Sequence, residues 1–143
     1  MDKKYQEYKF SIVVPCYNEA LAVAKTAKDI VSTLERWKED KEVKLSFEMI
    51  FVNDGSTDET SSELATLDKT YPMLKVIENK INCGYGASLK KGIQASKYDS
   101  IVITDADGTY PNERVPELLK GLENSDMVIG ARIGKNVQIP ALR

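Results

Sequence analysis

Two aspartates separated by one residue, Asp105 and Asp107, have the side-chain types and spacing that best predict chemistry in this sequence. They follow an apolar run typical of a strand, 101–103, and Gly108 comes directly after them. Side chains two residues apart in a strand leave on the same side, so we expect both carboxylates to point into one cleft. Carboxylates that close repel each other unless a proton or cation lies between them. A hard divalent ion such as Mg²⁺ suits these oxygens and keeps positions open for substrate phosphates, so the pair predicts a metal–diphosphate site.

The same D-x-D-G segment is also good turn chemistry. Taken alone, it is equally consistent with a solvated turn after a buried strand. The elements around it therefore decide between a site and a turn.

Strand-type and helix-type segments alternate along the chain. The continuous apolar run 12–14 suits a strand that is covered on both faces, as in parallel sheets. Ser56 and Glu59 have the spacing of a helix capping box, and Pro116 suits the first position of a helix. The expected strands are 8–16, 45–53, 74–78, one from 101 to the aspartate pair, and 126–130, and the expected helices run from 18 or 19 to about 38, from 57 to about 69, over 87–97, and from 116 to about 122. This order predicts one α/β domain over 1–143, with residues 1–7 flexible and an open, mostly parallel sheet of five strands between helices.

Polar side chains follow four of these strands. Ligands of parallel α/β sheets bind beyond the carboxyl ends of the strands. The loops at the opposite edge are merely charged, so the polar loops point to a site rather than to turn chemistry alone. The four segments are 17–19, Asp54, 82–86 and 105–107.

Individual residues in these loops match the needs of a nucleotide diphosphate. A carboxylate at position 54 can accept hydrogen bonds from the N–H groups of uracil or guanine, although an acid at a helix N-terminus is the competing interpretation of Asp54. Gly84 and Gly86 permit close approach of the backbone to phosphate or ribose. Lys90 and Lys91 are expected on a solvated helix face.

Composition excludes several function classes. The 143-residue chain is long enough for one domain with a core, and its net charge of −2 argues against a general nucleic-acid binder. With no histidine, zinc sites built on imidazole and serine–histidine catalysis are excluded within this chain. Cys16 and Cys83 are expected to be reduced thiols of a cytoplasmic protein. The charged N-terminus has no apolar signal-peptide core, and no stretch has the length of a membrane span.

Five segments together resemble family 2 glycosyltransferases of the GT-A fold, in the order seen in that family. The similarity is greatest to the branch of dolichol-phosphate mannose synthases and polyprenyl-phosphate glycosyltransferases. The segments are VPCYNE at 14–19, VNDGSTD at 52–58, NCGYGA at 82–87, TDADG at 104–108 and MVIGAR at 127–132.

The resemblance implies an inverting transfer of a sugar from a GDP- or UDP-linked donor. It implies that Asp105 and Asp107 hold Mg²⁺ or Mn²⁺ on the diphosphate and that Asp54 contacts the base. A glutamine that often follows the second aspartate in this branch is Thr109 here, so a third protein ligand is not supplied. The remaining donor-site residues by resemblance are Pro15, Tyr17, Glu19, Asn82, Gly84, Gly86 and Arg132, with Arg143 as a further arginine near phosphate.

Members of this family continue well past position 143. The chain therefore resembles the N-terminal nucleotide-binding half, with the acceptor-binding half and the usual acidic base absent. A polyprenyl phosphate acceptor is itself an anion, which reduces the need for a strong base, and it would place the full-length protein at the cytoplasmic face of a membrane. Two alternatives remain: a non-catalytic nucleotide-sugar-binding fragment, and a sugar nucleotidyltransferase, whose glycine-rich basic loop is not matched by residues 15–19.

Overall fold

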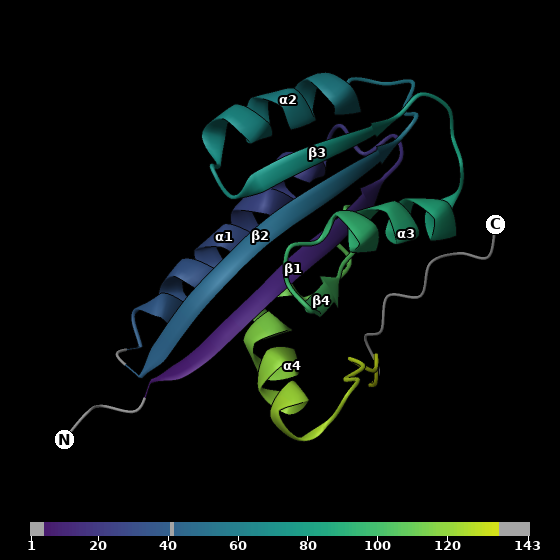
Figure 1. The fold of residues 1–143 in the computed structure, drawn as a ribbon. Helices are drawn as coiled ribbons and strands as arrows, with labels where there is room; N and C mark the ends of the chain where they lie inside the picture. The colour runs from purple at the N-terminus through teal and green to yellow at the C-terminus, as the bar shows by residue number, and fades with distance from the viewer. Residues whose placement is uncertain (1–4, 41, 135–143) are drawn as a thin grey trace.

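The computed structural model describes residues 5–40 and 42–134, which form a parallel four-stranded sheet with helices on both faces (Figure 1). The strand order is β3-β2-β1-β4. The strands are β1 (Gln6–Cys16), β2 (Val43–Asp54), β3 (Leu74–Asn79) and β4 (Ser100–Ile103), and the helices are α1 (Val23–Lys38), α2 (Thr60–Thr70), α3 (Tyr85–Ala95) and α4 (Val115–Gly121), with 3₁₀ turns at η1 (Asn112–Arg114) and η2 (Leu122–Asn124). The predicted open α/β sheet is confirmed.

β1 lies in the middle of the sheet, between β2 and β4. Its residues are buried without interruption from Phe10 to Cys16, as the apolar run predicted for a strand covered on both faces. Val13 pairs with Ile50 of β2 on one side and Ile103 of β4 on the other. The strand that leads to the first polar loop is thus held by neighbours on every side.

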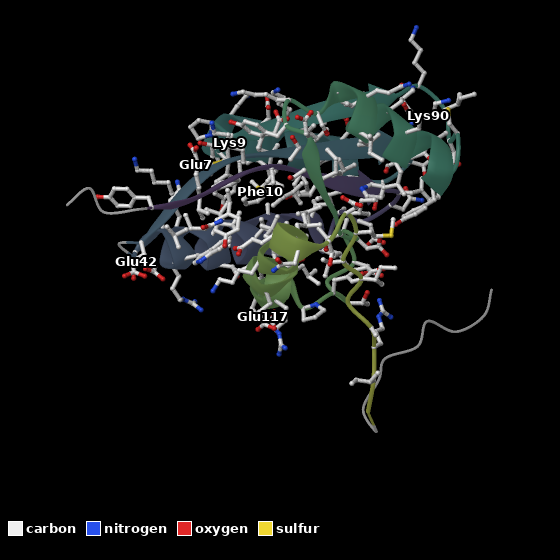
Figure 2. All side chains as sticks on the ribbon, turned by 60° about the horizontal axis from the view of Figure 1, so that its bottom comes forward. Glu7, Lys9, Phe10, Glu42, Lys90 and Glu117 are labelled. Carbon is white, nitrogen blue, oxygen red and sulfur yellow. The ribbon has the colours of Figure 1, made fainter. Side chains whose placement is uncertain are left out.

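Two layers of helices cover the sheet. The larger core joins one face of the sheet to α1, α2 and α4, while α3 packs on the other face against Val13, Ile50 and Val52. Gly92 sets how closely α3 approaches, because a Cβ there would lie 2.3 Å from Val13 Cγ1. Figure 2 shows the Phe10 ring inside the molecule and charged side chains such as Glu117 at its periphery.

The first helices begin later than predicted because polar side chains before them bind a neighbouring loop instead. Asn18 has the left-handed φ of 53°, and α1 begins only at Val23. The capping box is wrong: Ser56 Oγ donates to Asn53 Oδ1 at 2.5 Å and does not cap a helix. Asp58 Oδ1 accepts the Thr60 N–H at 2.9 Å where α2 begins.

The predicted fifth strand, 126–130, is wrong in the described part of the chain. This segment has no strand partner there and lies along α4 instead. A Cβ at Gly121 would lie 2.9 Å from a methyl group of Val128, whereas Met127 and Ile129 are 75% and 77% exposed. Alternating apolar residues indicate a segment able to form a strand, but the ladder needs a neighbour that local sequence does not provide.

Candidate functional site

The loops after β1 and β2 are tied together by Asn18. Its backbone N–H donates to Ser56 Oγ at 2.9 Å, and its Oδ1 accepts the Thr57 N–H at 2.8 Å. Asparagine tolerates the left-handed conformation because its short amide can bond locally. These contacts place Tyr17, which precedes Asn18, beside the end of β2.

Asp54 is the last residue of β2 and the register partner of Asn79, the last residue of β3. Its Oδ1 accepts from Asn79 Nδ2 and the Cys83 N–H, both at 2.8 Å, and its Oδ2 accepts from the Gly84 N–H at 2.9 Å. The residue is only 4% exposed. Burial alone would raise the pKa of the Asp54 carboxyl, but these hydrogen bonds outweigh it and hold the pKa below its usual range. Asp54 is therefore an ionised carboxylate that fixes the loop after β3.

A pocket of about 230 Å³ lies at this edge of the sheet. Its lining includes the following residues that the sequence predicted: Pro15, Tyr17, Asp54, Asn82 and Gly84. Cys16, Tyr85 and Ser88 complete it. Glu19 and Gly86 do not line the pocket; Glu19 begins the turn before α1, and Gly86 lies in the first turn of α3.

The two predicted glycines differ in what the backbone requires. Gly84, immediately before α3, has a φ of 94°, a conformation that side-chain-bearing residues rarely adopt. Gly86 is helical, and a Cβ there would meet no atom within 4 Å. Of these two positions, only 84 requires glycine for the conformation of the backbone.

The aspartate pair lies in a turn and not in a strand, because β4 ends at Ile103. The predicted extension of the strand to the pair is wrong, yet the alternation of buried and open side chains continues. Thr104 and Ala106 are buried, Asp105 is half-buried and Asp107 is exposed. The buried positions are anchored by hydrogen bonds from Thr104 Oγ1 to Asn112 Oδ1 at 2.8 Å and from Thr26 Oγ1 to the Ala106 carbonyl at 2.9 Å.

The pair carries negative charge that its surroundings only partly offset. Burial and the charge of Asp107 raise the pKa of the Asp105 carboxyl, although hydrogen bonds from the Tyr85 and Tyr110 hydroxyls and the charge of Arg132 act in the opposite direction. Tyr85 donates to Asp105 Oδ1 at 3.0 Å. Asp107 Oδ1 accepts from the N–H and the hydroxyl of Thr109, at 2.9 and 2.7 Å. Within the described ranges, no group of three or more histidines, cysteines and acidic residues forms a complete metal cluster.

Arg132 lies close enough to the aspartate pair for its charge to act on Asp105. Its guanidinium carbon is 4.8 Å from the centre of the Tyr110 ring, and Tyr110 in turn bonds Asp105. Arg143, the other predicted arginine, lies outside the described residues.

Sequence reasoning missed Tyr85, which both lines the pocket and bonds Asp105. Its position between the two predicted glycines was the available signal. Lys91 is exposed, as predicted for a solvated helix face, and its Nζ also donates to Asn79 Oδ1, a contact that the sequence did not predict. Lys90 is exposed, as predicted, and Figure 2 shows it at the outer rim of the molecule.

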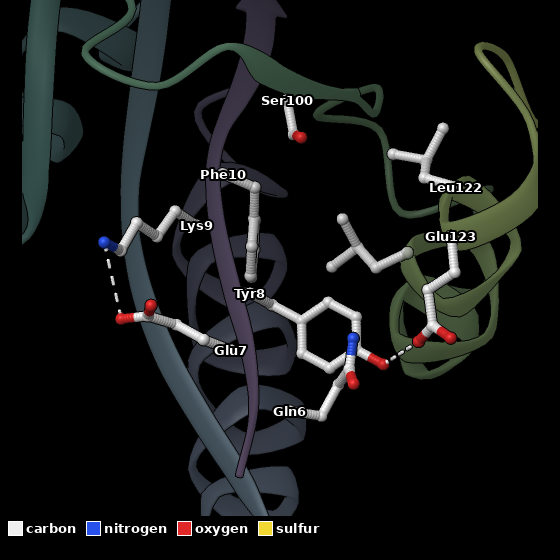
Figure 3. Close-up of a pocket in the computed structure, with 9 residues that line it drawn as sticks. Gln6, Glu7, Tyr8, Lys9, Phe10, Ser100, Leu122 and Glu123 are labelled. Carbon is white, nitrogen blue, oxygen red and sulfur yellow. Dashed lines mark hydrogen bonds and ion pairs between the residues drawn. The ribbon is translucent and has the colours of Figure 1, made fainter. Parts of the chain in front are cut away.

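A second hollow, of about 170 Å³, lies near the amino end of β1 (Figure 3). The Tyr8 hydroxyl donates to Glu123 across it, and Lys9 pairs with Glu7 at 3.4 Å. None of the predicted site residues lines it. The candidate site is therefore the pocket at the carboxyl ends of the strands, together with the aspartate pair.

The sequence model of the family described as Glycosyl transferase family 2 matches residues 11–141. The chain belongs to this family. It is 30% identical over 128 residues to the dolichyl-phosphate beta-glucosyltransferase of Trichomonas vaginalis, covering 85% of this chain and 39% of that one. It is also 30% identical over 132 residues to the dolichol-phosphate mannosyltransferase of Pyrococcus furiosus, covering 92% of this chain and 35% of that protein.

A solved structure shares the fold. The mannosyltransferase of Pyrobaculum calidifontis, in complex with GDP-Man and Mn²⁺, superposes with a TM-score of 0.55 at 25% identity, covering 75% of this chain and 30% of that chain. The predicted GT-A architecture is thereby confirmed. The 143-residue chain spans well under half the length of the curated relatives it matches.

Proposed function

We propose that this chain binds the nucleotide diphosphate-sugar donor of a glycosyltransferase, with GDP or UDP as the nucleotide and a divalent cation on the diphosphate. The observation that carries the proposal is the contact between Tyr85 and Asp105, because it joins the pocket to the aspartate pair. The nucleotide part of the donor has a base at one end and a diphosphate, which carries the sugar, at the other, and this edge of the sheet offers a place for each. The named relatives transfer glucose or mannose in connection with dolichyl phosphate, which supports the same reaction class.

The base end of the donor fits the pocket beside Asp54. The Asp54 carboxylate is ionised and lines the pocket. It can therefore accept a hydrogen bond from an N–H group of uracil or guanine through the part of the carboxylate that faces the pocket. Tyr17 adds a half-exposed aromatic ring to the same lining, which suits stacking against a base. The two nucleotides remain alternatives because both bases carry such an N–H.

The aspartate pair fits a divalent cation such as Mg²⁺ or Mn²⁺. Asp105 and Asp107 supply oxygen ligands, and a cation between the two carboxylates would relieve the repulsion between their like charges. When bound, the cation would neutralise charge on the diphosphate leaving group. Arg132, stacked on Tyr110, adds a fixed positive charge on the same side. The Mn²⁺ and GDP-Man of the Pyrobaculum calidifontis mannosyltransferase support this assignment.

The proposed transfer is an inverting substitution at the anomeric carbon of the sugar. The bond from that carbon to the donor diphosphate breaks, a bond to the acceptor oxygen forms, and GDP or UDP leaves. A polyprenyl phosphate is the proposed acceptor; as an oxyanion it needs no proton removed before it attacks. In residues 5–40 and 42–134, no helix has the length and apolar character to cross a membrane. The dolichyl phosphate in the names of the relatives supports the proposal that the acceptor is met at a membrane surface.

The direct test is product analysis with the purified chain, Mn²⁺, a short polyprenyl phosphate, and GDP-mannose or UDP-glucose. We expect release of GDP or UDP from one donor, and no release by Asp107→Asn. Donor binding without release would support the non-catalytic alternative. Formation of a nucleotide diphosphate-sugar from a nucleoside triphosphate and a sugar phosphate would contradict the proposal and favour a nucleotidyltransferase.

A further inference from the structure

We infer that Lys91 and Asn79 are positioning residues that orient the Asp54 carboxylate for base binding. The inference rests on the proposed function, since it explains how the base end of that same pocket is set. Neither residue lines the pocket, so neither is assigned a direct contact with the donor.

The geometry centres on the amide of Asn79, which is 5% exposed. Its Nδ2 donates to Asp54 Oδ1 at 2.8 Å and to Ser88 Oγ at 3.3 Å, while its Oδ1 accepts from Lys91 Nζ. An amide presents a donor on one side and an acceptor on the other, and a lysine ammonium only donates. Lys91 therefore selects the orientation in which the NH₂ group faces Asp54.

The opposite amide orientation would place the Asn79 oxygen against the Asp54 carboxylate. Two acceptors would then meet in a buried place, which costs at least the lost hydrogen bond. Asp54 Oδ1 also accepts the Cys83 N–H, and Oδ2 accepts the Gly84 N–H. Any shift of the carboxylate would consequently move the loop that forms one wall of the pocket.

Three side chains on one face of helix α3 make contacts with the candidate site. Tyr85, Ser88 and Lys91 are spaced three residues apart, so they lie on the same side of the helix. Tyr85 reaches Asp105, whereas Ser88 and Lys91 both contact Asn79. One helix face thus sets the metal side and the base side of the candidate site together.

The test compares Lys91→Met with Lys90→Met, because Lys90 makes no hydrogen bond or ion pair within the described part of the chain. Affinities for GDP, UDP and inorganic pyrophosphate are measured by calorimetry in Mn²⁺. We expect Lys91→Met to weaken nucleotide binding by about threefold to tenfold and to leave pyrophosphate binding unchanged. Lys90→Met should match the wild type, and Lys91→Arg should retain most of the affinity. Equal weakening of nucleotide and pyrophosphate, or no weakening, would overturn the inference.

A second measurement needs no ligand. Amide hydrogen exchange of Cys83 and Gly84 reports directly on their bonds to Asp54. We expect exchange about threefold faster or more in Lys91→Met than in Lys90→Met. If the wild type binds neither GDP nor UDP, the proposed function fails, while the exchange rates still decide whether Lys91 positions Asp54. Unchanged exchange in Lys91→Met would refute the positioning role whatever the binding data show.

Discussion

The hydroxyl of Tyr85 donates a 3.0 Å hydrogen bond to Oδ1 of Asp105, although the two residues come from different elements. Tyr85 belongs to the first turn of α3, and Asp105 follows β4. Burial and the negative charge of Asp105 raise the pKa of the Tyr85 hydroxyl well above its usual value. It therefore stays protonated at neutral pH and remains a donor. The bond couples the base pocket to the proposed metal ligands.

Replacing this donor gives the first prediction. Tyr85→Phe keeps the ring in the pocket lining and removes the bond that orients Asp105. Since groups that hydrogen-bond a metal ligand typically change metal affinity by about 10–100-fold, we expect Mn²⁺ to bind about tenfold more weakly. Mn²⁺ titration in the presence of nucleotide measures this. Tyr5→Phe, at the exposed residue immediately before β1, is the control. Equal Mn²⁺ affinity in the two variants would disprove the orienting role of Tyr85.

The two glycines of the loop before α3 should respond differently to alanine. Gly84→Ala forces a φ of 94° on a residue with a side chain, so we expect it to lower the free energy of unfolding by about 1–2 kcal/mol. Gly86→Ala fills open space in a helix and should raise that free energy by up to about 1 kcal/mol. Urea denaturation measures both. If Gly86→Ala also weakens nucleotide binding, a close approach of the donor to the protein backbone at this position is supported. If Gly84→Ala is neutral, the conformational argument is wrong.

Acid stability should depend on Glu48, a buried carboxylate that pins the connection from α3 to β4. Burial opposes its ionisation, but bonds from Lys75, the Lys97 N–H and Ser11 outweigh it and lower the pKa of Glu48 from 4.5. A lowered carboxyl pKa stabilises the fold above the unfolded-state pKa, and that stability is lost as pH falls through the lower folded-state value.

We therefore expect Glu48→Gln to cost about 1–3 kcal/mol at pH 7. Its melting temperature should fall less than that of the wild type below pH 4.5. Thermal unfolding across pH measures this. Glu42→Gln, at an exposed position, should leave the pH profile unchanged, and parallel profiles of wild type and Glu48→Gln would refute the argument.

Arg132 gives a prediction about the diphosphate. Arg132→Ala removes the positive charge held over Tyr110 beside the aspartate pair. We expect GDP or UDP to bind about tenfold more weakly, with a smaller effect on the corresponding monophosphate, because charge-assisted bonds to phosphate are among the stronger ones. Arg36→Ala, near the end of α1, is the matched control. An equal loss for diphosphate and monophosphate would argue against a contact specific to the diphosphate.

The fold was predictable from features that act locally and repeat. The apolar run at 12–14 predicted a strand buried on both faces, and the alternation of strands and helices predicted a parallel sheet. The rule that ligands lie at the carboxyl ends of such strands predicted that Tyr17, Asp54 and Asn82 lie together, and all three line one pocket.

The errors come from interactions that depend on distant partners. Residues 126–130 have a strand pattern but no neighbouring strand in the described ranges, and so pack on α4. Ser56 has capping-box spacing, but its hydroxyl donates to Asn53 Oδ1 and accepts from the Asn18 N–H instead of capping a helix. Lys91 is exposed as predicted, but its contact with Asn79 was missed, because it joins α3 to the last residue of β3 and spacing along the sequence does not contain that relationship.

The central claim is that this edge of the sheet binds a nucleotide diphosphate through a metal on Asp105 and Asp107. The most direct measurement is calorimetric titration of the purified chain with GDP and with UDP, first with Mn²⁺ and then with EDTA. We predict that one of the two nucleotides binds, that EDTA abolishes the binding, and that Asp107→Asn does not bind it in Mn²⁺. Nucleotide binding that is unchanged by EDTA, or no binding of either nucleotide, would contradict the account.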